Sequence, residues 1–340
     1  MRKSFGIASA LIALGLVIGI VGLWIIGFDF TRLDNHNYEE RVFEIDADFD
    51  KISASGCPDD ITILPSEDAE ARVVCYDRER IAYSVSVKDG ELSVEIEDSR
   101  RWYDYVYPFG MTTKNTPVSI YLPKTEYESL DVSVDTSDVE VSDKLSFGNA
   151  KIEGKTCDII WGASLSGRLS IEVSTGNVSL SEMSAQSAQI TTTTGDVTVS
   201  SVEILKQLKV ACSTGRINVS DSECGELEAQ TDTGDVTLKK TDVSENVSIK
   251  TDTGDVHLEK TVAVGELDIA TDTGDVSFEL CDAENITVKT DTGDVTGSLL
   301  TEKIFYPKSS SGDIEIPRST KGGLCEITTS TGDIEMEIAD

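Results

Sequence analysis

Aspartates that surround a recurring glycine are the residues of this sequence best suited to chemistry. The triplet Asp-Thr-Gly occurs four times, beginning at Asp232, Asp252, Asp272 and Asp291. In an acid–base mechanism, two such carboxylates must meet and share a proton. Here the copies recur at a nearly constant interval, so the triplet belongs to a repeat. We therefore predict a turn sequence and assign no catalytic residue.

A second set of aspartates directly follows the same glycines: Asp235, Asp255, Asp275 and Asp294. Stacked repeats would align each set into a column of carboxylates about 5 Å apart. Such close charges repel one another unless they are hydrogen-bonded or neutralised. One interpretation is a Ca²⁺ ladder, with oxygen ligands from the aspartates of both sets and from adjacent threonines. The interpretation that we favour is that each Asp caps its own corner through backbone N–H groups. No other cofactor is predicted.

The repeat itself is the main structural signal. Its corner glycines are almost evenly spaced and lie at Gly176, Gly195, Gly215, Gly234, Gly254, Gly274, Gly293, Gly312 and Gly332. Apolar residues alternate with polar ones on both sides of each corner, which indicates strands. So short a unit cannot bury its apolar face alone, but stacked units can. We predict an all-β, single-stranded β-solenoid (β-helix) over residues 131–340. An antiparallel sandwich would explain the alternation but not the recurring corner.

Residues 38–130 are less regular and are predicted to form an N-terminal β entry and cap region. Strands are expected at 51–55 and 61–64, and a hairpin at 88–90. An aromatic loop contains Trp102, Tyr103, Tyr105, Tyr107 and Phe109. This loop is either a contact patch for a partner or a cover for the open solenoid end. At the other end, Glu335, Glu337 and Asp340 on the last coil are expected to discourage end-to-end stacking by repulsion.

The N-terminus carries a predicted membrane anchor. Residues 7–28 form an almost wholly apolar stretch without a charge, which is long enough to cross a bilayer. Arg2 and Lys3 precede it, so the short tail 1–5 should lie in the cytoplasm. We therefore predict a signal-anchor at 6–28, a linker at 29–37 and an extracytoplasmic C-terminal part. A cleaved signal peptide is the alternative, but the residues that follow fit a cleavage site poorly.

Composition excludes several classes of function. The formal net charge of −33 repels nucleic-acid phosphates and favours cations or basic partners. Seven cysteines without a C-x-x-C pair and only two histidines leave little material for a Cys/His zinc site. A bridge between Cys57 and Cys75 is the one disulfide considered. Neither His36 nor His257 has neighbouring residues in the sequence that are typical of a catalytic base. We therefore expect that the protein is not an enzyme.

The Gly-Asp-[Val/Ile]-x-[Leu/Val/Ile] ladder behind an N-terminal anchor resembles the bacterial "putative adhesin" family of unknown-function domains, over residues 45–338. The resemblance implies a β-helical extracytoplasmic domain of cell-envelope proteins, some of them linked to envelope-stress systems. It carries over no catalytic residue. We expect a binding or scaffold module with an envelope glycan or protein partner. An accessory protein of envelope-stress sensing and an envelope-polymer hydrolase are the alternatives, and the oligomeric state is left open.

Overall fold

The structure is a computed structural model of the 340-residue chain. It describes residues 38–78, 81–98 and 116–339, together with the single positions Gly15 and Trp24. The predicted tail, anchor and linker lie outside the described residues, apart from those two positions, and so does the aromatic loop at 102–109. In the part of the chain that the structure describes, no helix has the length and apolar character needed to span a membrane.

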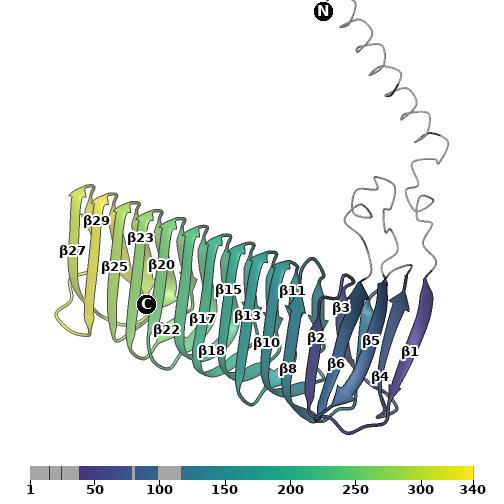
Figure 1. Ribbon diagram of the computed structural model, residues 1–340. Helices are drawn as coiled ribbons and strands as arrows, with labels where there is room; N and C mark the ends of the chain where they lie inside the picture. Colours follow the sequence, from purple (N-terminus) through teal and green to yellow (C-terminus); the bar gives the residue numbers. More distant parts are fainter. Residues whose placement is uncertain (1–14, 16–23, 25–37, 79–80, 99–115, 340) are drawn as a thin grey trace, which may run out of the picture.

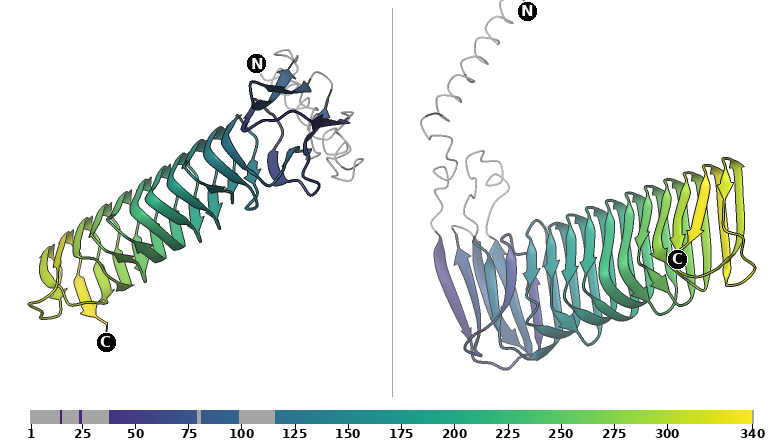
Figure 2. Two further views of the ribbon diagram at one scale, coloured as in Figure 1. Left: turned by 90° about the horizontal axis from the view of Figure 1, so that it is seen from below. Right: turned by 180° about the vertical axis from the view of Figure 1, so that it is seen from behind.

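The described strands form one 30-stranded sheet that winds into a rod (Figure 1). One ladder of the rod contains, in spatial order, β5 (Ile81–Lys88), β6 (Glu91–Asp98), β2 (Lys51–Ser55), β8 (Glu126–Val134), β10 (Ser146–Thr156), β13 (Arg168–Thr175), β15 (Ser184–Thr194), β17 (Glu203–Thr214), β18 (Ile217–Thr233), β20 (Val247–Thr253), β23 (Glu266–Thr273), β25 (Asn285–Thr292), β29 (Leu324–Thr331) and β27 (Ile304–Ser311). Figure 2 shows the same rod from two further directions, with the N-terminal strands at one end.

The second ladder lies across the glycine corner from the first. It contains, in spatial order, β1 (Glu39–Ile45), β4 (Ala71–Asp77), β7 (Val118–Leu122), β3 (Ile61–Pro65), β9 (Val139–Val141), β11 (Ile159–Trp161), β14 (Val178–Ser181), β16 (Val197–Ser200), the start of β18, β19 (Val236–Val243), β21 (Val256–Glu259), β24 (Val276–Cys281), β26 (Val295–Leu299), β30 (Ile334–Ile338) and β28 (Ile314–Glu315). The short strands β12 (Ser164–Leu165) and β22 (Val262–Ala263) add to a third side.

Parallel, in-register pairing explains why the repeat folds this way. Val236 pairs with Val256, and Val256 pairs with Val276, so equivalent residues of successive coils lie side by side. All three are buried in a single hydrophobic core cluster that runs along the rod. Each coil thus covers the apolar face of its neighbour. The prediction of an all-β β-solenoid is confirmed, and so is the hairpin, in which Lys88 pairs with Glu91.

Two corners of the coil have a backbone with positive φ. Glycine occupies the first corner, and residues with side chains occupy the second. Gly234 has φ +150°, and a Cβ at this position would lie only 1.9 Å from the carbonyl oxygen of Gly215 in the coil below. Glycine is therefore required there both for its φ and for the close approach. The next corner uses residues with side chains at φ between 46° and 55°: Glu182, Ser201, Asp221, Lys240, Lys260 and Leu280.

At both ends of the rod, the order of the coils in space differs from their order in the sequence. The last strands β29 and β30 insert between the β25–β26 coil and the β27–β28 coil (Figure 1). At the other end, β2 and β3 insert between β8–β9 and β6–β7. The prediction that Glu335, Glu337 and Asp340 protect the terminal coil is therefore wrong at Glu335, because β28 pairs with Ile334 and Glu335 of β30. Glu337 pairs only with Ser298 of β26, and Asp340 lies outside the described residues. The edge is β27, where Pro307 and Lys308 are features that discourage further strand pairing.

The N-terminal cap contains a buried ion pair. The guanidinium of Arg78 contacts the carboxylate of Asp59, and their side chains are only 8% and 9% exposed. The hydroxyl of Tyr83 donates a hydrogen bond to the same carboxylate. Burial, with the hydrogen bond to Asp59, raises the pKa of Tyr83. This cluster joins β5 to the loop between β2 and β3, and so links the antiparallel cap to the first parallel coil.

All seven cysteines are buried free thiols, so the bridge considered between Cys57 and Cys75 is not formed. Cys212 and Cys325 occupy inward positions of their coils. Burial raises the pKa of Cys57, Cys75 and Cys224 from 9.0 to about 12.

We expect the thiols to resist alkylation by iodoacetamide in the native chain at pH 8 and all seven to react in denaturant, as counted by mass spectrometry. Because the folded pKa values lie above the unfolded ones, the stability that these thiols contribute is complete below about pH 9 and is lost as pH rises towards 12. The urea midpoint should therefore fall over that window. Rapid native alkylation at pH 8 would contradict the buried placement.

Candidate functional site

The aspartates that follow the corner glycines form a hydrogen-bonded ladder between coils. The backbone N–H of Asp255 donates to Oδ1 of Asp235 at 3.0 Å, and the N–H of Asp275 donates to Oδ1 of Asp255 at 2.8 Å. The same bond joins Asp294 to Asp275 and Asp333 to Asp294, each at 2.8 Å. Our expectation that each Asp caps its own corner was therefore wrong in one respect. The carboxylate accepts from the neighbouring coil and so ties two coils together.

The ladder tolerates an amide in place of a carboxylate. Asn177 occupies the post-glycine position of its coil, and its Oδ1 accepts the N–H of Asp196 at 3.0 Å. Asp196 in turn accepts from the backbone N–H of Arg216 at 2.9 Å and from its guanidinium at 2.9 Å. These contacts, led by the backbone hydrogen bond, lower the pKa of Asp196. An amide oxygen therefore fills this role as a carboxylate oxygen does, so a charge is not essential. Arg216 occupies the same position of the next coil but has no acceptor oxygen, so it donates to the ladder and does not extend it.

The aspartates that precede the glycine by two form a separate, exposed column: Asp232, Asp252, Asp272 and Asp291. The parallel register of β18 and β20 places Asp232 beside Asp252, and Lys250 lies 3.9 Å from Asp252. A Ca²⁺ ion needs six to eight oxygen ligands. Because the ladder already uses one oxygen of each post-glycine carboxylate, an ion would have to draw on the remaining oxygens. The calcium ladder stays a prediction.

Buried threonines support the corner from inside. The hydroxyl of Thr251 donates to the carbonyl oxygen of Gly234 in the coil below at 3.2 Å, and Thr231 bonds Gly215 in the same way. A buried hydroxyl without a partner would be destabilising, so this bond explains why Thr recurs at an inward position. Cys212 takes the place of Thr in its coil, and its Sγ lies 3.2 Å from Oγ1 of Thr231.

Two substitutions at one aspartate of the ladder distinguish the effect of its hydrogen bond from the effect of its charge. Asp255→Asn should keep the coil stable, since Asn177 already fills this role, whereas Asp255→Ala should lower the free energy of unfolding by about 1.5–3 kcal/mol through loss of a hydrogen bond to a charged group. Urea denaturation of the full chain measures both. Equal stability of the two variants would show that the inter-coil bond contributes nothing.

The calcium interpretation has its own test, the melting temperature of the full chain with millimolar Ca²⁺ or Mg²⁺. If the aspartates bind calcium, only Ca²⁺ should raise the melting temperature. The rise should disappear when Asp235, Asp255, Asp275 and Asp294 are all changed to Asn, a variant that retains the ladder acceptors. An equal shift with Mg²⁺, or none, would leave the aspartates with a structural role alone.

A groove on the third side of the rod was missed by sequence reasoning. It has a volume of about 360 Å³ and is lined by Leu205, Gly225, Ser244 and Val264, which occupy one equivalent position in four successive coils, and by Glu203, Glu223 and Asp242 among others. Leu205 and Val264 are 65% and 68% exposed, an unusual placement for large apolar residues. Glycine and serine in the two coils between them leave the space open. Aligning the repeats position by position could have found this pattern.

Comparison with known proteins identifies the family of the chain but not its function. No curated protein matched the chain. A "putative adhesin" from Bacteroides fragilis is 14% identical with a TM-score of 0.35, covering 88% of this chain and 97% of that one. A "putative lipid binding protein" from Parabacteroides distasonis is 13% identical with a TM-score of 0.35, covering 89% and 98%. These scores are too low to support an argument about function.

The family model is the decisive match. It is described as Toastrack DUF4097, and it matches residues 49–260 and 217–340. The matched segments overlap and together cover residues 49–340, which include the whole solenoid and the cap region after β1. They agree with the fold and with the resemblance that the glycine corners had indicated. The chain belongs to the Toastrack DUF4097 family.

Proposed function

We propose that this protein is a non-enzymatic binding or scaffold module of the cell envelope, anchored by residues 6–28 with its N-terminus in the cytoplasm and its solenoid outside the membrane. The anchor and its orientation are supported by the apolar stretch and by the flanking charges alone. The observation that carries a binding role is the groove between Leu205 and Val264. Its ligand would be a segment of an envelope protein.

The chemistry of the groove specifies what that segment should look like. Leu205 and Val264 offer apolar contact at the two ends, across the open positions of Gly225 and Ser244. Glu203, Glu223 and Asp242 line one side with negative charge. A segment with an apolar side chain next to Lys or Arg would complement both features. The net charge of −33 would draw such a segment towards the rod from a distance.

The experiment compares two fluorescent peptides by anisotropy with the full chain in detergent. In one peptide Lys alternates with Leu, and in the other every Leu is replaced by Ser. We expect the Lys/Leu peptide to bind more tightly. The variant Ser244→Phe fills the groove and should remove that preference. The matched variant Ser248→Phe lies on an exposed position of the same coil, outside the groove, and should keep it.

Each outcome bears on the proposal in a defined way. Equal binding of the two peptides, or equal loss in both variants, would show only a general attraction to acidic surface and would contradict a groove-specific site. Competition by soluble peptidoglycan fragments would move the partner from protein to glycan. Cleavage of those fragments by the chain, abolished by a single Asp substitution, would overturn the non-enzymatic assignment.

A further inference from the structure

A patch of four polar side chains lies on the outer face of β21 and β24. The two strands are parallel and in register, with His257 paired to Ser277 and Glu259 paired to Glu279. Side chains two residues apart on a strand point to the same face, and paired residues of neighbouring strands lie about 5 Å apart. The register alone therefore places one imidazole and two carboxylates on the same face of two neighbouring strands.

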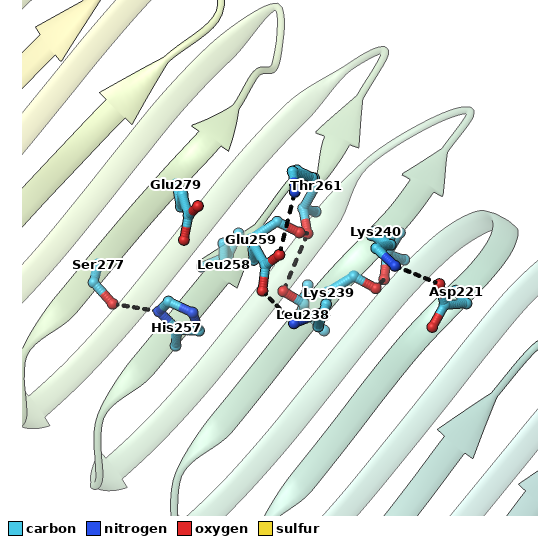
Figure 3. Close-up of polar contacts among 12 residues, drawn as sticks. Asp221, Leu238, Lys239, Lys240, His257, Leu258, Glu259, Thr261, Ser277 and Glu279 are labelled. Atoms are coloured by element: carbon cyan, nitrogen blue, oxygen red, sulfur yellow. Dashed lines mark hydrogen bonds and ion pairs between the residues drawn. The ribbon is translucent and has the colours of Figure 1, made fainter. Parts of the chain in front are cut away.

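The side chains do converge. One ligand atom from each of His257, Glu259 and Glu279 lies within 4.8 Å of the other two. Nδ1 of His257 is 2.8 Å from Oγ of Ser277. Figure 3 shows this bond on one side of the ring, with the carboxylates of Glu259 and Glu279 on the other side. Ser277 thus orients the imidazole and leaves Nε2 as the nitrogen that can bind a ligand.

Lysines complete the surroundings of Glu259. Nζ of Lys239 lies 2.6 Å from Oε2 of Glu259, and Nζ of Lys260 lies 3.5 Å from Oε1. Lys239 is on the coil below, so it approaches from the side opposite to Glu279 (Figure 3). A cation shared by His257, Glu259 and Glu279 would keep Lys239 as an outer partner that holds the Glu259 carboxylate. Such outer hydrogen bonds are typical of metal-binding carboxylates.

The mixture of donors selects the ion. Ca²⁺ and Mg²⁺ prefer all-oxygen sites, whereas an imidazole with carboxylates suits Zn²⁺ and related transition metals. Three protein ligands with room for a water form a known arrangement for Zn²⁺. We propose that His257, Glu259 and Glu279 form a surface site for Zn²⁺, with Ser277 as a positioning residue. The corresponding position in other coils carries no imidazole: Thr198, Asn218, Thr237, Ser277, Thr296 and Glu335.

The site is distinct from the aspartate ladder and from the apolar groove. Among the described residues, this is the one group of three His, Cys, Asp or Glu side chains whose ligand atoms come this close. The sequence-based prediction about zinc considered sets of cysteine and histidine only, and so it did not include one histidine with two glutamates. The repeat hides such a site, because Glu259 and Glu279 belong to one coil position and His257 to another.

The test is calorimetric titration of the full chain with Zn²⁺, followed by Co²⁺ as a spectroscopic substitute. We expect one equivalent to bind, and the Co²⁺ form to show visible absorption bands of a low-coordinate site. His257→Thr places the residue of Thr237 and Thr296 at this position, so the coil should fold normally. It should abolish both signals. Ser277→Ala should weaken Zn²⁺ binding by roughly 10-fold, as expected of an outer partner.

A matched control comes from another coil. Glu335 occupies the same coil position as His257 and pairs with Glu315, forming an acidic group without an imidazole. Glu335→Gln should leave Zn²⁺ binding unchanged. Unaltered affinity and absorption in His257→Thr would overturn the proposal. So would displacement of Zn²⁺ by equimolar Ca²⁺, since an all-oxygen surface cluster would then be the binder. Neither result would bear on peptide binding in the groove.

Discussion

Replacing Gly234 with alanine is expected to lower the stability of the solenoid by about 3 kcal/mol or more. The new Cβ would lie 1.9 Å from the carbonyl oxygen of Gly215, which belongs to backbone that is itself held in the ladder. At φ +150° a side chain is strained as well. Relief requires the two coils to separate, which would disturb the inter-coil bond that the Gly215 N–H donates to the carbonyl oxygen of Thr233 at 2.9 Å.

Hydrogen exchange is the suitable measurement, because a repeat array can lose structure locally and need not unfold in one step. Protection should fall in the coils around Gly234 and persist towards the cap. Gly90→Ala is the matched control. Its φ of +81° is also unfavourable, but the new Cβ would meet only the Asp50 side chain at 3.4 Å. We expect a loss of about 1 kcal/mol there. Equal effects at both positions would contradict a backbone clash as the cause.

Replacing Arg78 with methionine is expected to lower the free energy of unfolding by about 3–5 kcal/mol, because it leaves the buried carboxylate of Asp59 without its countercharge. Tyr83 alone would then donate to that carboxylate. Urea denaturation, with the intrinsic fluorescence and the circular dichroism recorded together, would measure the loss. Loss of the cap signal ahead of the solenoid signal would locate the effect at the N-terminal end.

The double variant Asp59→Leu with Arg78→Met tests the cause. Removing both charges should restore part of the lost stability, since burying two apolar side chains is less unfavourable than burying one unpaired charge. Tyr83→Phe, which removes only the hydroxyl, should have a smaller effect than Arg78→Met. A single Arg78→Met variant within about 1 kcal/mol of the original chain would show that Asp59 is not dependent on this partner.

The solenoid and its inward face could be predicted from the amino-acid sequence. The two-residue alternation on both sides of each corner glycine predicted which residues are buried, and Val236, Val256 and Val276 are buried. The nearly constant spacing of the corner glycines predicted stacking in register. Both follow from local rules, because strand periodicity and corner geometry depend on neighbours in the chain. Gly234 could therefore be assigned a corner from its place in the repeat alone.

The order in which the coils stack could not be predicted from the sequence and is known from the three-dimensional structure. The segments around Gly312 and Gly332 read alike, so no local rule could show that β29 and β30 insert ahead of β27 and β28. The partner of Asp235 was hidden for the same reason, since its acceptor bond is to Asp255 of the next coil. The approach of His257 to Glu279 and the groove between Leu205 and Val264 also arise between coils. Contacts between stacked coils depend on the order in which the coils stack and on the distance between their side chains. Neither can be derived from the local sequence of one coil.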